Sequence, residues 1–131
     1  MDERTLAELC WRFDDQAFNR GDLSVVDELV HPDFVNHDPL LGQGTDRDAI
    51  RDYVPVFRKA FPDLRCRNEM LVVQGDEVAH ILVFTGTQRG EFAGQPARGQ
   101  RLTIRSHDFQ RWQNGKMIER WSQAGIEGLT S

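Results

Sequence analysis

Cysteine is scarce in this sequence, and long apolar runs are missing. The chain of 131 residues has two cysteines, Cys10 and Cys66, which form no Cys-x-x-Cys motif and stand near no histidine cluster. A disulfide framework and a structural zinc site are therefore unsupported, and both thiols are expected to be buried as small apolar groups. No apolar run approaches the ~18 residues that a membrane span needs.

A surplus of basic residues is missing too. Lysine and arginine number 16 against 21 aspartates and glutamates, so the net charge is −5 at pH 7. Nucleic acids and anionic membranes attract a positive surface, and neither is expected as a partner. The first residues, Met1-Asp2-Glu3-Arg4, lack the basic-then-apolar order of a signal peptide, so the sequence predicts a cytoplasmic protein.

Motifs of several large enzyme classes are absent as well. The chain has no GxSxG, GxxxxGK(S/T) or GxGxxG pattern, which leaves α/β-hydrolase, P-loop and dinucleotide-binding folds without support. No spacing of histidines, cysteines and acids brings three metal ligands together. The length is that of a single domain, residues 1–131, that buries about two-thirds of its unfolded surface.

What the sequence does contain is helical periodicity followed by strand periodicity. Helices are predicted for residues 3–20, 24–30 and 46–60, the last with a kink at Pro55, and a short strand for residues 33–38. Four strands are predicted afterwards, at residues 65–73, 77–87, 101–112 and 116–126, joined as an antiparallel meander. This order predicts an α+β fold with three helices on one face of a curved antiparallel sheet.

The last hairpin contains Asn114-Gly115, the strongest short turn signal. A two-residue turn there pairs residues whose numbers sum to 229, so Asp108 should lie opposite Trp121. One face of the hairpin, expected to point to the helices, then carries Leu102, Ile104, Ser106, Asp108, Gln110, Trp112, Met117, Glu119, Trp121 and Gln123. The other face carries Arg101, Arg105, His107, Phe109, Arg111, Ile118, Arg120 and Ser122.

Polar residues on the helix-facing side need an explanation, because a buried charge is costly without a partner. A polar pocket lined by aromatic residues would account for Asp108, Gln110 and Gln123. The alternative is that the carboxylates lie at an open rim of the sheet and are solvated, which applies above all to Glu119, near the hairpin end.

Several short segments together resemble a known family. The segments are residues 31–39 (HPDFVNHDP), 60–64 (AFPDL), 75–78 (GDEV), 85–87 (TGT) with Gly90-Glu91-Phe92 and Gly94, and Asp108 with residues 114–121 (NGKMIERW). In this order they are similar to the SnoaL-like ester cyclases, or polyketide cyclases, of the NTF2-like superfamily. The resemblance covers nearly the whole chain.

The resemblance implies a cone-shaped barrel with an enclosed apolar pocket, and a homo-oligomer, either a dimer or a tetramer. It also implies a cofactor-free enzyme in which a carboxylate removes a proton next to a carbonyl group, and the enolate then closes a ring. The family often carries acidic residues after the tryptophan of the last strand, where this chain has Ser122 and Gly125. Either Asp108 takes over as base, or the protein no longer performs this chemistry.

Asp108 is therefore predicted as the base, with a pKa raised by an apolar pocket, and His37 as its partner or proton donor. The alternative for His37 is a surface histidine bonded to Asp38 or the backbone. The pocket is predicted to be shaped by Trp121, Gln123, Phe13, Tyr53 and Phe57. His80 is predicted as a satisfied core histidine or a pocket-lining residue.

The sequence thus favours a cofactor-independent cyclase or isomerase acting on a hydrophobic, polyketide-like carbonyl compound. Two alternatives remain open at this point. One is a non-catalytic protein that binds a small molecule in the same cone, which an Asp108 paired with an arginine would favour. The other is an epoxide-opening hydrolase or cyclase, which needs an Asp–Arg–Asp arrangement around a water molecule.

Overall fold

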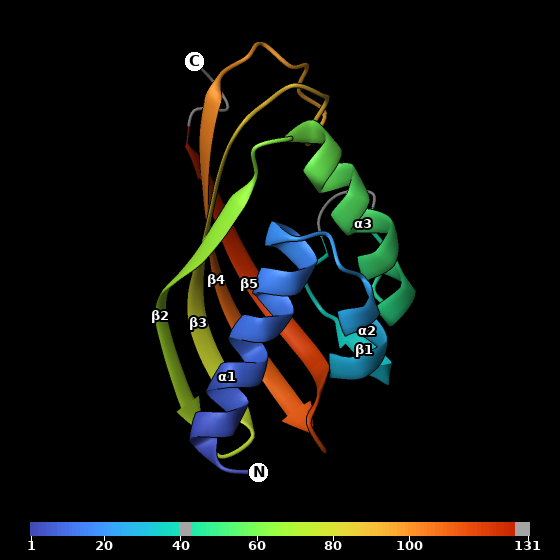
Figure 1. Cartoon of the computed structure of the whole chain (residues 1–131), viewed down its shortest axis with the longest axis vertical. Coiled ribbons are helices and arrows are strands. Elements are labelled where there is room, and N and C mark those ends of the chain that lie inside the picture. Colours follow the sequence, from blue (N-terminus) through green and yellow to red (C-terminus); the bar gives the residue numbers. More distant parts are fainter. Residues whose placement is uncertain (40–42, 128–131) are drawn as a thin grey trace.

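The first half of the chain folds into helices whose apolar stripes face a sheet (Figure 1). In this computed structural model, which describes residues 1–39 and 43–127, the helices are α1 (Glu3–Asp14), the π-helical turn η1 (Asp15–Asn19), α2 (Ser24–Leu29) and α3 (Arg47–Ala60). The carboxylates of Asp2 and Asp46 cap α1 and α3 by accepting backbone N–H groups. The predicted first helix is therefore α1 continued by η1, and α3 runs through Pro55, whose side chain is exposed.

The second half of the chain forms most of a five-stranded sheet in the order β1-β5-β4-β3-β2. The strands are β1 (Val30–Asn36), β2 (Arg65–Gln74), β3 (Glu77–Thr87), β4 (Arg101–Gln113) and β5 (Lys116–Glu127). Strands β2 to β5 make the predicted antiparallel meander. Strand β1 begins earlier than expected, directly after α2, and pairs with β5 in parallel.

The β4–β5 hairpin departs from the predicted register. Its turn is as expected, since Asn114 and Gly115 have φ of 53° and 78° and Gln113 pairs with Lys116. Trp112 then pairs with Met117 but Arg111 pairs with Glu119, so Ile118 is an extra residue in β5. This β-bulge turns the rest of β5 over, because side chains alternate between the faces of a strand.

The bulge makes three of the predictions wrong. Asp108 pairs with Ser122, not with Trp121, which pairs with Phe109. The helix-facing side of β5 beyond the bulge carries the residues that were expected outside, Arg120 and Ser122. The outer face of the sheet carries the residues that were expected inside, Glu119, Trp121 and Gln123.

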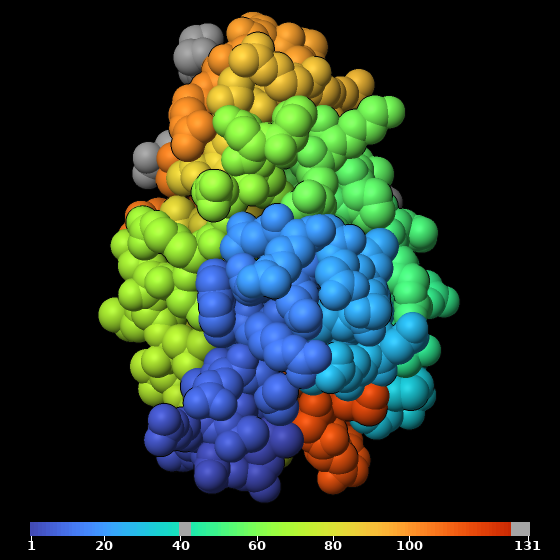
Figure 2. All heavy atoms as spheres, in the orientation of Figure 1, coloured from blue at the N-terminus to red at the C-terminus, as the bar shows by residue number. Residues whose placement is uncertain are grey.

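The core lies between the helices and the sheet, in two clusters. One joins α1, α2 and β1 to the lower half of the sheet in Figure 1, around Phe13, Phe34 and Trp112. The other joins α3 to the upper half, around Phe57, Phe61 and Phe84. In the space-filling view, α1, η1 and α2 form a continuous surface over the middle of the sheet (Figure 2). Within residues 1–39 and 43–127, no helix has the length and apolar character to cross a bilayer.

Candidate active site

A cavity of about 90 Å³ lies between the helices and the inner face of the sheet, where the two core clusters meet. Its apolar wall is made by Phe13, Phe18, Phe34, Ile50, Phe57, Leu82, Phe84, Phe92, Ile104, Met117, Ala124 and Ile126. Its polar wall is made by Asp14, Asn36, Gln43, Tyr53, Ser106, Asp108, Gln110, Arg120 and Ser122. The structure thus brings together Asp108, Phe13, Tyr53 and Phe57 of the predicted site residues.

Trp121, Gln123 and His37 lie outside this cavity. Trp121 points to the outer face of the sheet, where its ring stacks on His37 at 4.6 Å between centroids and 9° between planes. The Nε2 atom of His37 is 2.9 Å from a carboxylate oxygen of Glu119, and Gln123 is exposed. The bulge separates Trp121 and Gln123 from Asp108, and the contacts of His37 are with the outer-face residues rather than with Asp108.

Asp108 is buried, and neighbouring side chains donate hydrogen bonds to both of its carboxylate oxygens. Both of its carboxylate oxygens accept hydrogen bonds from Nη2 of Arg120 at 3.2 Å, and one accepts a further bond from the Ser106 hydroxyl. Burial alone would raise the pKa of Asp108, but the Arg120 guanidinium and the bonds from His80 and Ser106 lower it to about 2. The expected raised pKa is therefore wrong, and Asp108 is a weak base that holds Arg120 in place.

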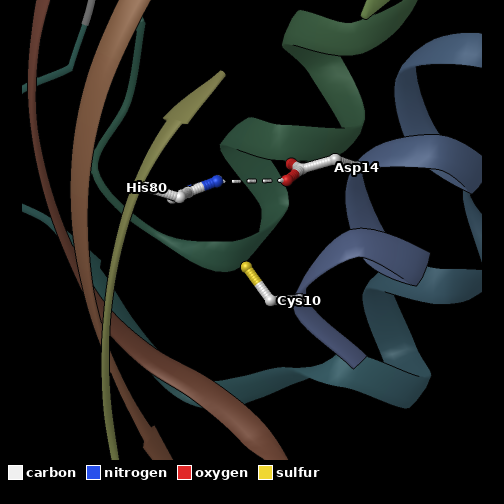
Figure 3. Close-up of side chains that lie close together, drawn as sticks. All are labelled: Cys10, Asp14 and His80. Atoms are coloured by element: carbon white, nitrogen blue, oxygen red, sulfur yellow. Dashed lines mark ion pairs between the residues drawn. The ribbon is translucent and has the colours of Figure 1, made fainter. Parts of the chain in front are cut away.

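A second carboxylate, Asp14, has the properties that were expected of Asp108. Asp14 is the last residue of α1, its side chain is 4% exposed, and its Oδ2 atom has no hydrogen-bond partner in the described part of the chain. Oδ2 points to Nδ1 of His80 on β3 at a distance of 3.9 Å (Figure 3). Burial raises the pKa of Asp14 to about 7, although the charges on His80 and Arg120 oppose this.

His80 lies behind the cavity wall and joins the two acids. Its Nδ1 atom is 3.1 Å from Oδ1 of Asn68, and its Nε2 atom is 3.4 Å from Oδ2 of Asp108. Burial lowers the pKa of His80, but the bond to Asp108 and the charge on Asp14 outweigh it and raise the pKa above 6.5. Asp14 therefore changes protonation near neutral pH, and its titration is coupled to that of His80, whose Nδ1 atom is 3.9 Å away.

Gln110 completes this contact network. Its Oε1 atom accepts hydrogen bonds from the indole N–H of Trp112 at 2.9 Å and from the Cys10 thiol at 3.4 Å. Its amide nitrogen is consequently directed to Nε2 of His80, at 3.1 Å, and can donate there when His80 is neutral. When His80 is protonated, the same Nε2 donates to Asp108 instead.

Cys10, Asp14 and His80 are residue types that bind zinc, and their ligand atoms lie within 4.8 Å of one another (Figure 3). Around a zinc ion, such atoms lie about 3.5 Å apart, and a cysteine ligand is a thiolate. Here burial and the nearby acids raise the pKa of the Cys10 thiol, which donates a hydrogen bond to Gln110. These contacts fit a site that binds protons better than one that binds a metal ion.

Asp14 and Arg120 were not predicted from the sequence. Asp14 carried a signal, because it lies four residues after Cys10 on the stripe formed by Leu6, Cys10 and Ala17 and is the acidic member of that stripe. Arg120 carried none, since its direction depends on the bulge at Ile118.

The cavity wall thus contains a carboxylate that can take up a proton, Asp14. It also contains the guanidinium of Arg120, which a second carboxylate, Asp108, holds in place. Helices packed on one face of a curved, mostly antiparallel five-stranded sheet, with a cavity between the two layers, form an NTF2-like fold. The sequence matches the family "SnoaL-like polyketide cyclase" over residues 8–128, and the chain belongs to this family.

Solved structures agree on the fold. TsrD from Streptomyces laurentii is 24% identical with a TM-score of 0.85, and the match covers 95% of this chain and 90% of that one. AclR, a putative hydroxylase from Streptomyces galilaeus, is 27% identical with a TM-score of 0.79 and coverages of 95% and 91%. IdmH, a putative polyketide cyclase from Streptomyces antibioticus, is 28% identical with a TM-score of 0.77 and coverages of 91% and 91%. Among curated proteins, none matches this sequence.

Proposed function

We propose that this protein is a cofactor-independent cyclase or isomerase that removes a proton from the carbon next to a carbonyl group of a hydrophobic, polyketide-like compound, with Asp14 as the base. The observation that carries the proposal is that Oδ2 of Asp14, in the cavity wall, has no hydrogen-bond partner among the described residues and belongs to a carboxylate with a pKa of about 7. A general base works best when its pKa is near the working pH. The family and the likeness to IdmH support the polyketide-like substrate class.

The reaction follows from the two charged groups on the polar wall. The C–H bond breaks, its proton goes to Oδ2 of Asp14, and its electron pair moves to the carbonyl oxygen, which becomes an enolate. The Nε and Nη1 atoms of Arg120 have no partner among the described residues and are available to bind that oxygen, while Asp108 holds Nη2. In a cyclisation the first carbonyl group re-forms as the enolate carbon attacks a second carbonyl group, whose oxygen becomes an alkoxide and takes the proton from Asp14. In an isomerisation the substrate has a neighbouring C=C bond, and the resulting dienolate takes the proton back from Asp14 at its far carbon.

Asp108 and His80 are positioning residues in this scheme. Asp108 fixes the guanidinium of Arg120, and His80 offsets the charge that Asp14 carries when it is ionised. Phe13, Tyr53 and Phe57 shape the cavity around the substrate. The cavity is smaller than the engineered cavity of about 150 Å³ that holds benzene, so a substrate of several rings requires lining side chains to move.

Exchange of α-hydrogen for deuterium tests the proposal without the natural substrate. We expect the protein in D₂O to accelerate exchange in ketones graded in size from cyclohexanone to α-tetralone, followed by proton NMR. The rate should rise with pH to a plateau with a midpoint near 7, because only ionised Asp14 accepts a proton. Asp14→Asn should lower the rate about 100-fold or more.

Asp15→Asn is the matched control, since Asp15 makes the same chemical change one residue away and pairs with Arg20 rather than facing the cavity. Wild-type exchange by Asp14→Asn would contradict the role of Asp14.

The second candidate function is the binding of a small molecule without chemistry. The pairing of Asp108 with Arg120 favours it, because that pair leaves Asp108 unable to act as a base. Ketones that bind, by shifts in the protein's NMR spectrum, but show no accelerated exchange would support this candidate. The epoxide-opening alternative is less well supported, because the structure bonds Arg120 to Asp108 and directs Asp14 to His80.

A further inference from the structure

The connection between β3 and β4, residues 88–100, contributes one aromatic ring to the cavity. It lies at the end of the molecule beside the C-terminal end of α3, as Figure 1 and Figure 2 show. Its residues are exposed or half-buried except Gln88 and Phe92. Phe92 is 8% exposed, and its ring forms part of the cavity wall. We call residues 90–97, which include this ring, the flap.

The flap folds back on itself as a small hairpin. The backbone N–H groups of Phe92 and Gln95 each donate to the carbonyl group of the other, at 3.0 and 2.9 Å. Between them, Ala93 and Gly94 have φ of 51° and 76°, the positive values that a two-residue hairpin turn requires. The flap can therefore move as one unit without losing these bonds.

Gln88 and Gln100 form the base of the flap. The backbone N–H of Gln88 donates to the Gln100 carbonyl at 3.0 Å, and the Gln100 side-chain amide donates to Oε1 of Gln88 at 2.7 Å. The Nε2 atom of Gln88 donates to the carbonyl groups of Gly90 and Gln95, both at 2.9 Å. The first two bonds hold the ends of the connection together, and the last two hold the flap down on its base.

The backbone of the flap is joined to α3 at one point. The N–H groups of Arg89 and Gly90 donate to the carbonyl group of Ala60, at 2.8 and 3.3 Å. Within the described part of the chain, residues 91–97 make no hydrogen bond outside the connection 88–100. Beyond Gly90, hydrogen bonds therefore do not hold the flap against the helix.

Ring contacts hold the flap instead. The Phe92 ring stacks on Phe57 of α3, with 5.4 Å between centroids and 17° between planes. It also meets Phe61 in an edge contact, with 5.1 Å between centroids. Such contacts are not directional in the way of hydrogen bonds, so another flat apolar ring can take the place of Phe92 beside Phe57.

Phe92 differs in this respect from the rest of the apolar wall. The other apolar residues that line the cavity in the described part of the chain belong to helices or strands. Moving one of them breaks backbone hydrogen bonds of its element, and local opening occurs where few bonds and contacts have to be lost. Because a substrate of several rings requires lining side chains to move, the flap is the part of the wall that yields first.

We propose that the flap is the gate of the cavity and that Phe92 is the residue that determines which ligands enter. On opening, residues 90–97 swing away from α3 about the base, so that Gly90 leaves Ala60 and the Phe92 ring leaves Phe57. A hydrophobic ligand enters, and the ring closes against it. The inference rests on the proposed function for the kind of ligand, a hydrophobic ketone, but it requires no proton transfer.

An engineered disulfide between residues 60 and 90 tests the gate. A Cβ atom on Gly90 would lie 3.9 Å from the Cβ atom of Ala60, close to the value of about 3.8 Å in disulfides. Ala60→Cys combined with Gly90→Cys should therefore form a disulfide with oxidised glutathione, while the two native thiols are buried. We call the oxidised variant the locked protein. Failure of this disulfide to form would contradict the closed contact between the flap and α3.

The rate of ligand association is the quantity to measure. We expect α-tetralone to associate with the locked protein about 100-fold or more slowly than with the wild type, and dithiothreitol to restore the rate. Tryptophan fluorescence after rapid mixing follows binding, since Trp11 packs against the core cluster that contains Phe57 and Phe92. Ala60→Ser combined with Gly90→Ser is the matched control and should bind at the wild-type rate with or without oxidant.

Two further variants of the locked protein separate the gate from the size of the cavity. Phe92→Ala removes the ring that has to move, so association should return to within about threefold of the wild-type rate despite the disulfide. Phe84→Ala removes an equal ring from the wall, but from strand β3, and association should stay slow. Circular dichroism and the thermal midpoint of each variant show that it is folded.

Three results would overturn the proposal. They are wild-type association by the locked protein, equal rates in the locked Phe92→Ala and Phe84→Ala variants, and no binding of any ketone from cyclohexanone to α-tetralone by the wild type. Hydrogen exchange in the same ketones distinguishes the gate from the proposed function. Binding that the disulfide slows, without exchange, supports the gate and contradicts the catalytic base. Exchange that the disulfide does not slow supports the base and contradicts the gate.

Discussion

Two arginine–carboxylate pairs lie close together in the β4–β5 hairpin, one on each face of the sheet. Arg120 pairs with Asp108 on the inner face, where the acid is 2% exposed, and Arg111 pairs with Glu119 on the outer face, where the acid is 27% exposed. The inner pair is part of a closed network with Ser106 and His80, whereas the outer pair is solvated and touches Trp121 and His37. The same kind of ion pair is therefore buried on the inner face and solvated on the outer face.

The inner and outer pairs differ because removing a charge from water costs free energy, and only the inner pair is buried. An exposed pair contributes little, because water stabilises each charge when its partner is lost. A buried pair leaves an uncompensated charge when it is broken. The buried space between the helices and the inner face can consequently hold the α1 carboxylate Asp14 in an unusual protonation state, and the outer face cannot do this for an acid.

Removing each arginine in turn gives the largest expected contrast. Arg120→Met should lower the free energy of unfolding by about 3–5 kcal/mol at pH 7, because Asp108 is left buried and unpaired. Arg111→Met should lower it by at most about 1 kcal/mol. Urea unfolding of both variants measures the two losses.

The loss in Arg120→Met should shrink at pH 4, since Asp108 without its partner takes up a proton there. Equal losses in Arg120→Met and Arg111→Met would show that the two faces do not differ as described.

The pH dependence of stability gives the next contrast, and its sign is opposite on the two faces. Burial raises the pKa of Asp14 from 3.8 to about 7, so the folded state binds the proton more tightly and stability falls as pH rises from about 4 to 7. At about 1.36 kcal/mol per pKa unit, the fall attributable to Asp14 is at most about 4 kcal/mol. Asp14→Asn should remove it, and Asp15→Asn should not.

The outer-face acid behaves in the reverse way. The hydrogen bonds from His37 and Arg111 lower the pKa of Glu119, so its contribution to stability is present above 4.5 and is lost as pH falls below that value. Urea titrations of wild type and Asp14→Asn between pH 4 and 8 measure the fall in stability that is attributed to Asp14. Parallel curves for the two proteins would mean that Asp14 is not strained by its burial.

Removing the outer histidine should have the smallest effect. His37→Ala loses the stacking on Trp121 and the contact with Glu119, both at the surface, so we expect a loss of about 0.5–1 kcal/mol. The rate of α-hydrogen exchange should stay within about twofold of the wild type, because these contacts lie on the outer face. A loss of exchange comparable to that of Asp14→Asn would restore the catalytic role that the sequence predicted for His37.

Much of the fold was predictable because local patterns determine it. The apolar stripe from Leu6 to Ala17, the alternation in β3 and β4, and Asn114-Gly115 each indicate one element by its own period or turn chemistry. The parallel pairing of β1 with β5 was not predicted, since it joins segments about 85 residues apart and leaves no periodic signal in either.

The candidate site was predicted only in part, and the reason is a single residue. Sequence alternation placed the side chains of β4 correctly, so Asp108, Gln110 and Trp112 are buried as expected. In β5 the extra residue Ile118 reverses the alternation, and no propensity distinguishes a strand with a bulge from one without. The prediction therefore paired Asp108 with Trp121 and missed Arg120.

The sequence by itself determined the class of protein: a helical first half, an antiparallel meander, and a set of segments that identifies the SnoaL-like family. Only the tertiary structure decided which groups share the cavity. Asp14 and His80 are 66 residues apart, and their protonation depends on burial and on the charges of Asp108 and Arg120. A pKa near 7 is a property of that shared, water-poor space, and the order of residues along the chain does not contain it.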